Sequence, residues 1–186
     1  MTLGLKQNTV QLAAHDANWE EIARQTILRL WEIFGSAAEE IVHIGSTSIK
    51  GIKAKPIIDI AVAIKDFEAF MPLIPMLEQN GFFYRGWFLY ARDIVLNVYA
   101  TPENSDDKII THHVHVVKAN GADWKHHILF RDYLNAHPSV AKAYEALKVA
   151  LASTNPYDVG REKYNAGKNE FIAQILRDAD RWQEEP

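Results

Sequence analysis

The chain has 186 residues, 48% of them hydrophobic, and no cysteine, so we expect one compact domain over residues 1–186 without disulfides or thiolate metal sites. The formal net charge of −4 argues against nucleic acid as a partner. The N-terminal residues lack the apolar run of a signal peptide and no stretch approaches about 18 apolar residues, so a cytoplasmic protein without a membrane partner is expected.

The first half of the chain predicts a helix followed mainly by strands. Asp16 and Asn18 supply capping side chains for a helix from Trp19 to Phe34, which Gly35 stops. Hydrophobic periodicity then predicts strands over Glu40–Gly45 and Pro56–Ile64, a helix over Phe67–Gln79, and strands over Phe82–Leu89, Asp93–Ala100 and Ile109–Lys118, with a turn at 90–92 and a loop at 101–107.

The last third of the chain has a helical pattern. It predicts helices over Asp123–Ala136 and Ser139–Ala152 and, after the break at Asn155-Pro156, over Val159–Trp182. The expected fold class is therefore α+β, with a mixed sheet of about five strands, helices on one face and a helical C-terminal third.

The segment from His43 to Ser48 predicts a short strand and a turn at Gly45-Ser46 that opens a helix. Such a turn can present unpaired backbone N–H groups to a phosphate. Asp59 lies on the next predicted strand, where a carboxylate can hold the metal that accompanies a phosphate. The pairing predicts a nucleotide site.

Alternation along the second strand separates Asp59 from the core. Ile58, Ile60 and Val62 fall on one face, and Asp59 and Ala61 fall on the other. Two-metal phosphoryl transfer usually needs a second carboxylate two positions after the first, and that position is Ala61. An alternative role for Asp59 is to cap the helix that opens at Ser46.

A later strand carries three histidines. Alternation places His113 and His115 on one face and His112 on the other. If His113 and His115 share a face with Asp59, two imidazoles and one carboxylate converge, a set that suits Zn²⁺, Mn²⁺ or Fe²⁺. The alternative is a pair of partly buried histidines hydrogen-bonded to neighbouring strands.

Basic and aromatic residues supply further candidates. Lys55, held extended by the following proline, is predicted to reach the site, whereas the neighbouring Lys50 and Lys53 are predicted to be solvated. Tyr164 and Lys168 are four residues apart and share a helix face that could close over a nucleotide.

Arg131 either binds a phosphate or an acidic group in the site or forms a salt bridge between helix and sheet. Being adjacent on a helix, Arg131 and Asp132 are expected to have separate partners. His126 and His127 are assigned no role.

The sequence resembles the GrpB family, a branch of the nucleotidyltransferase superfamily. The resemblance rests on the residues from Ile41 to Ile60, the His113–Val116 run, the helix around 129–134 with the following His137-Pro138, and the stretch from Tyr164 to Ile172. It implies a polymerase-β-like core with Gly45-Ser46 at the phosphate turn and Asp59 as first metal ligand. Active superfamily members carry two acids and a third on a later strand, where this chain has Ala61 and the two histidines.

These features give one leading hypothesis and two alternatives. The leading hypothesis is a nucleotidyltransferase-like protein that binds a nucleoside triphosphate or phosphorylated small molecule with a divalent metal, Mg²⁺ or Mn²⁺ in preference to Zn²⁺, and transfers a nucleotidyl group to a small molecule or protein. The alternatives are a catalytically degenerate binding module and a metalloenzyme built on the aspartate and histidines. The candidate site comprises a catalytic Asp59; the nucleotide-binding residues Gly45, Ser46, Thr47, Lys55, Arg131, Tyr164 and Lys168; and the metal ligands Asp59, His113 and His115.

Overall fold

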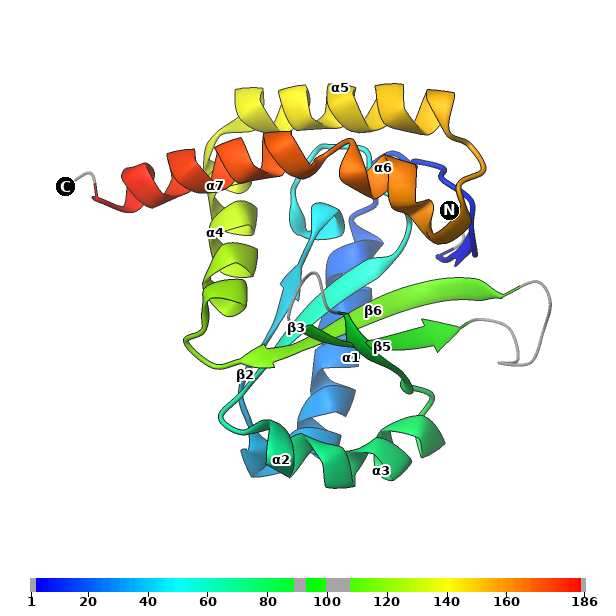
Figure 1. Ribbon diagram of the computed structural model, residues 1–186, viewed down its shortest axis with the longest axis vertical. Helices are drawn as coiled ribbons and strands as arrows, with labels where there is room; N and C mark the ends of the chain where they lie inside the picture. The colour runs from blue at the N-terminus through cyan, green and yellow to red at the C-terminus, as the bar shows by residue number, and fades with distance from the viewer. Residues whose placement is uncertain (1–2, 89–92, 100–107, 185–186) are drawn as a thin grey trace.

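The computed structural model describes residues 3–88, 93–99 and 108–184 and is organised around a mixed sheet (Figure 1). The predicted turn at 90–92 and loop at 101–107 lie outside the described residues. The strand order is β2-β3-β6-β5-β4, and β1 pairs with the first two residues of β6. Strands β3 and β6 run parallel, and the other pairs are antiparallel. The strands are β1 (Leu5–Lys6), β2 (Ala38–Ile44), β3 (Ile58–Ile64), β4 (Phe83–Phe88), β5 (Asp93–Tyr99) and β6 (Ile109–Lys118).

This sheet confirms the predicted α+β class and the five longer strands. The two-residue strand β1 was not predicted because two residues are too short to show alternation. The helices are α1 (Asn18–Phe34), α2 (Phe67–Phe70), α3 (Ile74–Gln79), α4 (Ala122–Ala136), α5 (Pro138–Thr154), α6 (Glu162–Ala166) and α7 (Asn169–Glu184), with single 3-10 turns η1 (Gly35–Ala37), η2 (Ser46–Ser48), η3 (Met71–Leu73) and η4 (Val159–Arg161).

Two predicted helices are interrupted. The one predicted over Phe67–Gln79 is split by η3, where a proline occupies the first turn of both η3 and α3 and removes backbone donors. The one predicted over Val159–Trp182 is split into η4, α6 and α7. Gly160 and Arg161 both adopt left-handed backbone angles, with φ of 63° and 58°, which an α-helix cannot accommodate.

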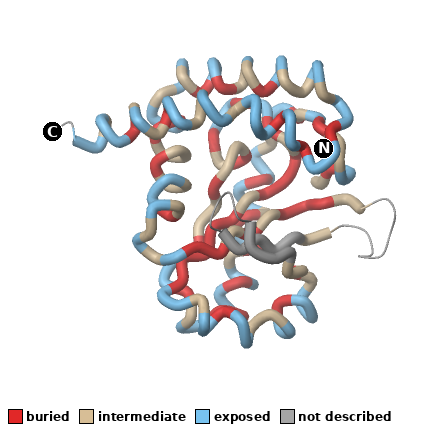
Figure 2. Tube along the Cα trace, viewed as in Figure 1, coloured by how far each residue is buried: buried red, intermediate tan, exposed pale blue. Residues whose placement is uncertain are grey.

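One face of the sheet forms the main core with α1. Ile58, Ile60, Val62 and Ile64 of β3 are buried in one cluster with the inner face of α1. Figure 2 shows this pattern as buried positions along the central strands and exposed positions on the outer sides of the helices. Burying each such side chain contributes about 1.5–3 kcal/mol, so this face supplies much of the stability.

The prediction that helices cover only one face is wrong. On the face opposite α1, Trp124 of α4 packs on Ala61, Ala63 and Val117. This second cover is partial, because α5, α6 and α7 pass over the remaining sheet edge without filling the space beneath them (Figure 1). Among the described residues, no helix combines the length and apolar character needed to cross a membrane.

Candidate functional site

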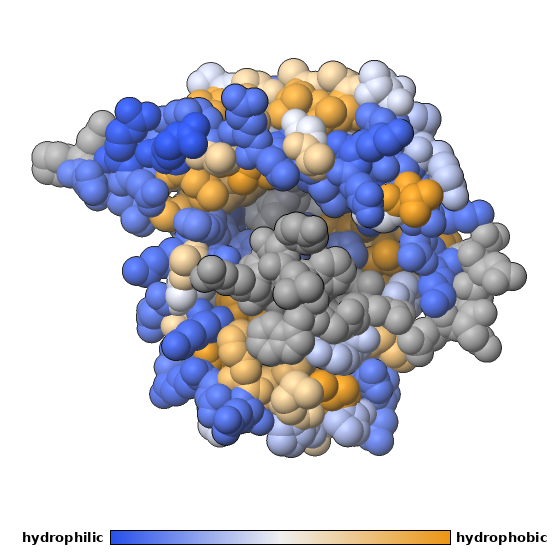
Figure 3. All heavy atoms as spheres, in the orientation of Figure 1, coloured by the Kyte–Doolittle hydropathy of each residue, from blue (hydrophilic) through white to orange (hydrophobic). Residues whose placement is uncertain are grey.

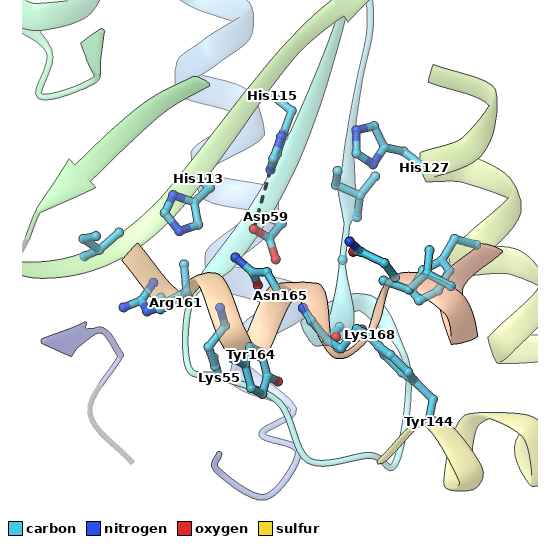
Figure 4. A pocket seen from close by; sticks show the side chains of 18 of the residues that line it. Lys55, Asp59, His113, His115, His127, Tyr144, Arg161, Tyr164, Asn165 and Lys168 are labelled. Carbon is cyan, nitrogen blue, oxygen red and sulfur yellow. Dashed lines mark ion pairs between the residues drawn. The ribbon is translucent and has the colours of Figure 1, made fainter. Parts of the chain in front are cut away.

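A cavity of about 710 Å³ lies between the second face of the sheet and the C-terminal helices (Figure 4). This volume is in the range of small-molecule sites. Strands β3 and β6, the turn after β2, and helices α4, α5, α6 and α7 all contribute to its wall. The predicted site residues that line the cavity are Gly45, Ser46, Lys55, Asp59, His113, His115, Tyr164 and Lys168.

Asp59 is the carboxylate of this cavity. Its position near the start of β3 pairs with Ile44 on β2 and with His113 on β6, so the side chain faces away from the α1 core as alternation predicted. Oδ1 lies 3.7 Å from Nε2 of His115. Burial alone would raise the pKa of the Asp59 carboxyl, but the adjacent His115 imidazole and nearby positive charge, Lys55 included, lower it to about 2. The group is therefore ionised at neutral pH.

Ala61 is two residues further along the same face but lies in a different environment. It is fully buried in an apolar cluster with Ile44, Ala63, Val117 and Trp124. A carboxylate at this position would be desolvated beneath the indole of Trp124. The second acid of a two-metal site is thus absent from the sequence, and its position is closed to solvent.

The turn after β2 brings the backbone directly against Asp59. Gly45 has φ of 71°, and a Cβ added there would collide with Oδ2 and lie 2.8 Å from Cβ of Asp59. Glycine is therefore required by both backbone angle and space. The predicted helix opening at Ser46 is only the single turn η2, and the glycine at its N-cap position provides no capping side chain.

Two lysines flank the ring of Tyr164 inside the cavity. Nζ of Lys55 lies 5.1 Å and Nζ of Lys168 lies 4.6 Å from the ring centroid. Burial, followed by the charge of Lys168, lowers the pKa of Lys55 to about 7, and burial lowers the pKa of Lys168 to about 8. The pair is poised to bind an anion, whose charge would restore full protonation of both amines.

Arg161 is a third cation of the cavity, and its geometry was not predicted. Nε donates to the carbonyl oxygen of Thr9 at 3.0 Å and Nη2 to that of Lys6 at 3.3 Å. Asn8 holds the same turn from the N-terminal segment, because its Oδ1 accepts from the Gly160 N–H at 3.0 Å. The N-terminal segment thus fixes the guanidinium against the cavity, a long-range arrangement without a local sequence signal.

The C-terminal helices also fix the loop between β2 and β3. The buried Lys148 donates to the carbonyl oxygen of Lys53 at 2.6 Å, and Lys142 donates to that of Gly51 at 2.7 Å. Asn135 donates to the carbonyl oxygen of Ser48 at 3.0 Å. The loop that carries the Gly45 turn is therefore anchored by three side chains from α4 and α5. Lys50 and Lys53 themselves are exposed, as predicted.

Two of the predicted nucleotide-binding residues, Thr47 and Arg131, lie outside the cavity lining. Thr47 is buried with Oγ1 2.9 Å from Nε2 of His43. Arg131 donates from Nε to Oδ1 of Asp132 at 2.7 Å and from Nη1 to the carbonyl oxygen of His43 at 3.1 Å. The expectation that Arg131 and Asp132 have separate partners is wrong, since the long arginine side chain folds back to its neighbour. These contacts assign both residues structural roles.

The histidines divide between the two faces of β6 as alternation predicted. His113 and His115 line the cavity, with ring centroids 6.5 Å apart, whereas His112 lies on the α1 side, 3.1 Å from Oγ1 of Thr26. Burial lowers the pKa of His113 to about 3, so this ring is neutral at pH 7.

Within the described parts of the chain, no three His, Asp or Glu side chains are arranged to hold a metal. His126 and His127, which were assigned no role, also line the cavity.

Comparison with known proteins matches nearly the whole chain. A family model described as GrpB protein matches residues 9–178. The chain is 37% identical over 179 residues to glutamate-rich protein GrpB of Alkalihalophilus pseudofirmus, covering 95% of this chain and 99% of that protein. It is 34% identical over 173 residues to UPF0157 protein YqkA of Bacillus subtilis, covering 93% of this chain but 48% of YqkA, so it spans about half of that relative.

Solved structures agree with this match. The crystal structure of conserved protein GrpB from Enterococcus faecalis has a TM-score of 0.82 at 29% identity, covering 94% of this chain and 100% of that chain. A structure of Cid1 poly(U) polymerase bound to MgATP has a TM-score of 0.50 at 11% identity, covering 73% of this chain and 42% of that chain. The second likeness is one of fold alone, and with the first it confirms the predicted nucleotidyltransferase-like fold.

Proposed function

Because the chain belongs to the GrpB family and has a nucleotidyltransferase-like fold, we propose that its cavity binds a nucleoside triphosphate together with a divalent cation and transfers the nucleotidyl group to a small molecule or protein. The observation that carries this proposal is the convergence of one ionised carboxylate, Asp59, with three cationic side chains, Lys55, Arg161 and Lys168, on a single cavity.

The charge of the cavity suits a polyphosphate. Three cations face one carboxylate, and His113 is neutral, so the cavity has an excess of positive charge within a chain of net charge −4. Ammonium and guanidinium groups form strong charge-assisted hydrogen bonds to phosphate oxygens. Lys55 and Lys168 both lie close to the Tyr164 ring and can contact different phosphates of one chain.

The donor groups fit one divalent cation rather than two. Mg²⁺ is commonly held by one or two protein carboxylates together with substrate phosphates and water, an arrangement that Asp59 can serve alone. Mn²⁺ also accepts imidazole, and His115 is the imidazole next to Asp59. A second cation has no carboxylate, because Ala61 occupies the buried second position. When bound, the cation would neutralise phosphate charge near Asp59.

The burial of Ala61 favours one second candidate, a module that binds the nucleotide without turnover. Removing a metal-ligating carboxylate weakens transition-state stabilisation, so binding can persist where transfer is slow or absent. Incubation with MgATP labelled at the α-phosphate separates the two, since only a transferase moves the label to protein or to an added acceptor.

Calorimetric titration of ATP and the other triphosphates, with and without Mg²⁺ or Mn²⁺, tests the binding proposal. In the wild type, the divalent cation should tighten binding at least about tenfold, a difference of about 1.4 kcal/mol. Asp59→Asn should abolish that tightening while metal-free binding is retained or improved, because a negative charge is removed. Asp180→Asn, on the exposed side of α7, is the matched control. Equal metal dependence in the Asp59→Asn variant would contradict the proposal.

A further inference from the structure

The cavity continues past Asp59 into a second compartment between α4 and α7. In Figure 4, Arg161 and Lys55 lie to one side of Asp59, and His127 lies to the other. We call this second region the α4–α7 compartment. It is lined by His126, His127 and Phe130 of α4 and by Asn169, Ile172 and Leu176 of α7.

Helical spacing explains why these six residues meet. Positions 126, 127 and 130 share one face of α4, and positions 169, 172 and 176 share one face of α7. Phe130, Ile172 and Leu176 pack against the buried cluster between the helices and turn their remaining surface to the cavity. In Figure 3, hydrophobic atoms gather along the side of α7 that faces α4.

The chemistry of the α4–α7 compartment differs from that of the cationic end. Its lining has no lysine, arginine, aspartate or glutamate, and the polar groups it offers are two imidazoles and the amide of Asn169. Such a lining disfavours a charged phosphate and favours an uncharged body with an apolar or aromatic surface.

The direction of phosphoryl transfer assigns a role to this compartment. The attacking and leaving oxygens lie roughly in line across the reacting phosphorus. The leaving pyrophosphate requires positive charge, which Lys55, Arg161 and Lys168 supply at the cationic end. With the reacting phosphate beside Asp59, the acceptor must approach from the opposite side, where the α4–α7 compartment opens.

We propose that the α4–α7 compartment binds the acceptor, a small uncharged molecule with an apolar or aromatic body and one hydroxyl group. This inference rests on the proposed nucleotidyl transfer. The acceptor oxygen forms a bond to the α-phosphorus, the α–β phosphoanhydride bond breaks, and pyrophosphate leaves with the bonding electron pair. The hydroxyl proton passes to solvent water.

Fluorescence titration with the neutral apolar probe N-phenyl-1-naphthylamine tests the compartment in the full chain. Asn169→Trp places an indole in the compartment from an exposed position, so the core is undisturbed. The neighbouring Glu170→Trp is exposed in the same turn of α7 but does not line the cavity, and it is the matched control. Wild type and Glu170→Trp should bind the probe saturably at one site, and Asn169→Trp should weaken binding at least about tenfold, or about 1.4 kcal/mol.

Competition and calorimetry separate this inference from the proposed function. Saturating MgATP should leave the probe bound, and Asn169→Trp should retain the MgATP affinity of the wild type. Displacement of the probe by MgATP would assign the compartment to the nucleotide and overturn the acceptor role, as would equal probe binding by the Asn169→Trp variant. Absence of MgATP binding with probe binding retained would overturn the proposed function and the acceptor role, while leaving a separate apolar-ligand site.

Discussion

Asp59 and Ala61 lie on the same face of β3, two residues apart, yet one faces a cavity with charged groups in its wall and the other is enclosed in apolar packing. The difference arises from what covers each position. Trp124 of α4 closes over Ala61, whereas the wall of the cavity beside Asp59 includes Tyr164 of α6 and Lys168, which lies between α6 and α7.

This contrast shows how one sheet face can hold a charge and a core side by side. Around Asp59, the adjacent His115 imidazole and the charge of Lys55 favour the carboxylate form, and the group stays ionised. Around Ala61, the packed side chains are apolar, so burying a charge there would carry a large desolvation cost. The cations that line the cavity around Asp59 come from three separate segments: Lys55 from the loop before β3, Arg161 from η4, and Lys168 from the junction of α6 and α7.

The largest expected effect comes from breaking this contrast with Ala61→Asp. A carboxylate buried beneath Trp124 should reduce the free energy of unfolding by about 3–5 kcal/mol at pH 7, because it loses its hydration among apolar side chains. Urea denaturation measures the change. The buried acid should have a raised pKa, so the loss relative to the wild type should shrink as the pH falls and the group becomes neutral.

Ala61→Ser is the control for this prediction, since it adds a polar atom without charge and should cost less than the aspartate. A stable Ala61→Asp variant that gains transferase activity would contradict the closed environment described for this position. That result would instead favour a site that needs only its missing acid.

Lys168→Ala tests the polar side of the comparison. Losing one charge-assisted contact should weaken MgATP binding by about 1.5–3 kcal/mol, or roughly tenfold to a hundredfold, in calorimetric titration. Lys163→Ala on the exposed face of α6 is the matched control and should bind as the wild type does. Equal weakening in both variants would show that general surface charge, rather than the cavity, attracts the nucleotide.

The depressed lysine pKa values predict a pH dependence of binding. The free cavity holds Lys55 and Lys168 with pKa values of about 7 and about 8, and a bound polyanion raises both. The complex therefore binds more protons than the free protein, so affinity for MgATP should fall as the pH rises from 7.5 to 9.5, by up to about tenfold per pH unit for each linked proton. Lys168→Arg, which stays charged, should flatten this slope; an unchanged slope would contradict the linkage.

Local periodicity was sufficient to predict the face of each residue on β3 and β6. Asp59, His113 and His115 converge because alternation on two parallel neighbouring strands is a backbone property. The partners of Arg161 and Lys148 could not be predicted this way, since both donate to carbonyl groups about a hundred or more residues away. The prediction of helices on one face missed the second cover, because helix amphipathicity reveals a buried side but does not identify the surface it buries.

The smallest expected effect concerns Arg131, which the sequence placed among the nucleotide-binding residues. Its guanidinium lies outside the cavity lining and donates to Asp132 and to the carbonyl oxygen of His43, just before the Gly45 turn. Arg131→Ala should therefore lower the free energy of unfolding by about 1 kcal/mol and leave the Kd for MgATP within about twofold. Urea denaturation and calorimetry on the same protein measure the two quantities. A large loss of affinity for MgATP with unchanged stability would instead show that Arg131 contacts the nucleotide. The cationic part of the binding site would then extend to α4, the helix that also encloses Ala61.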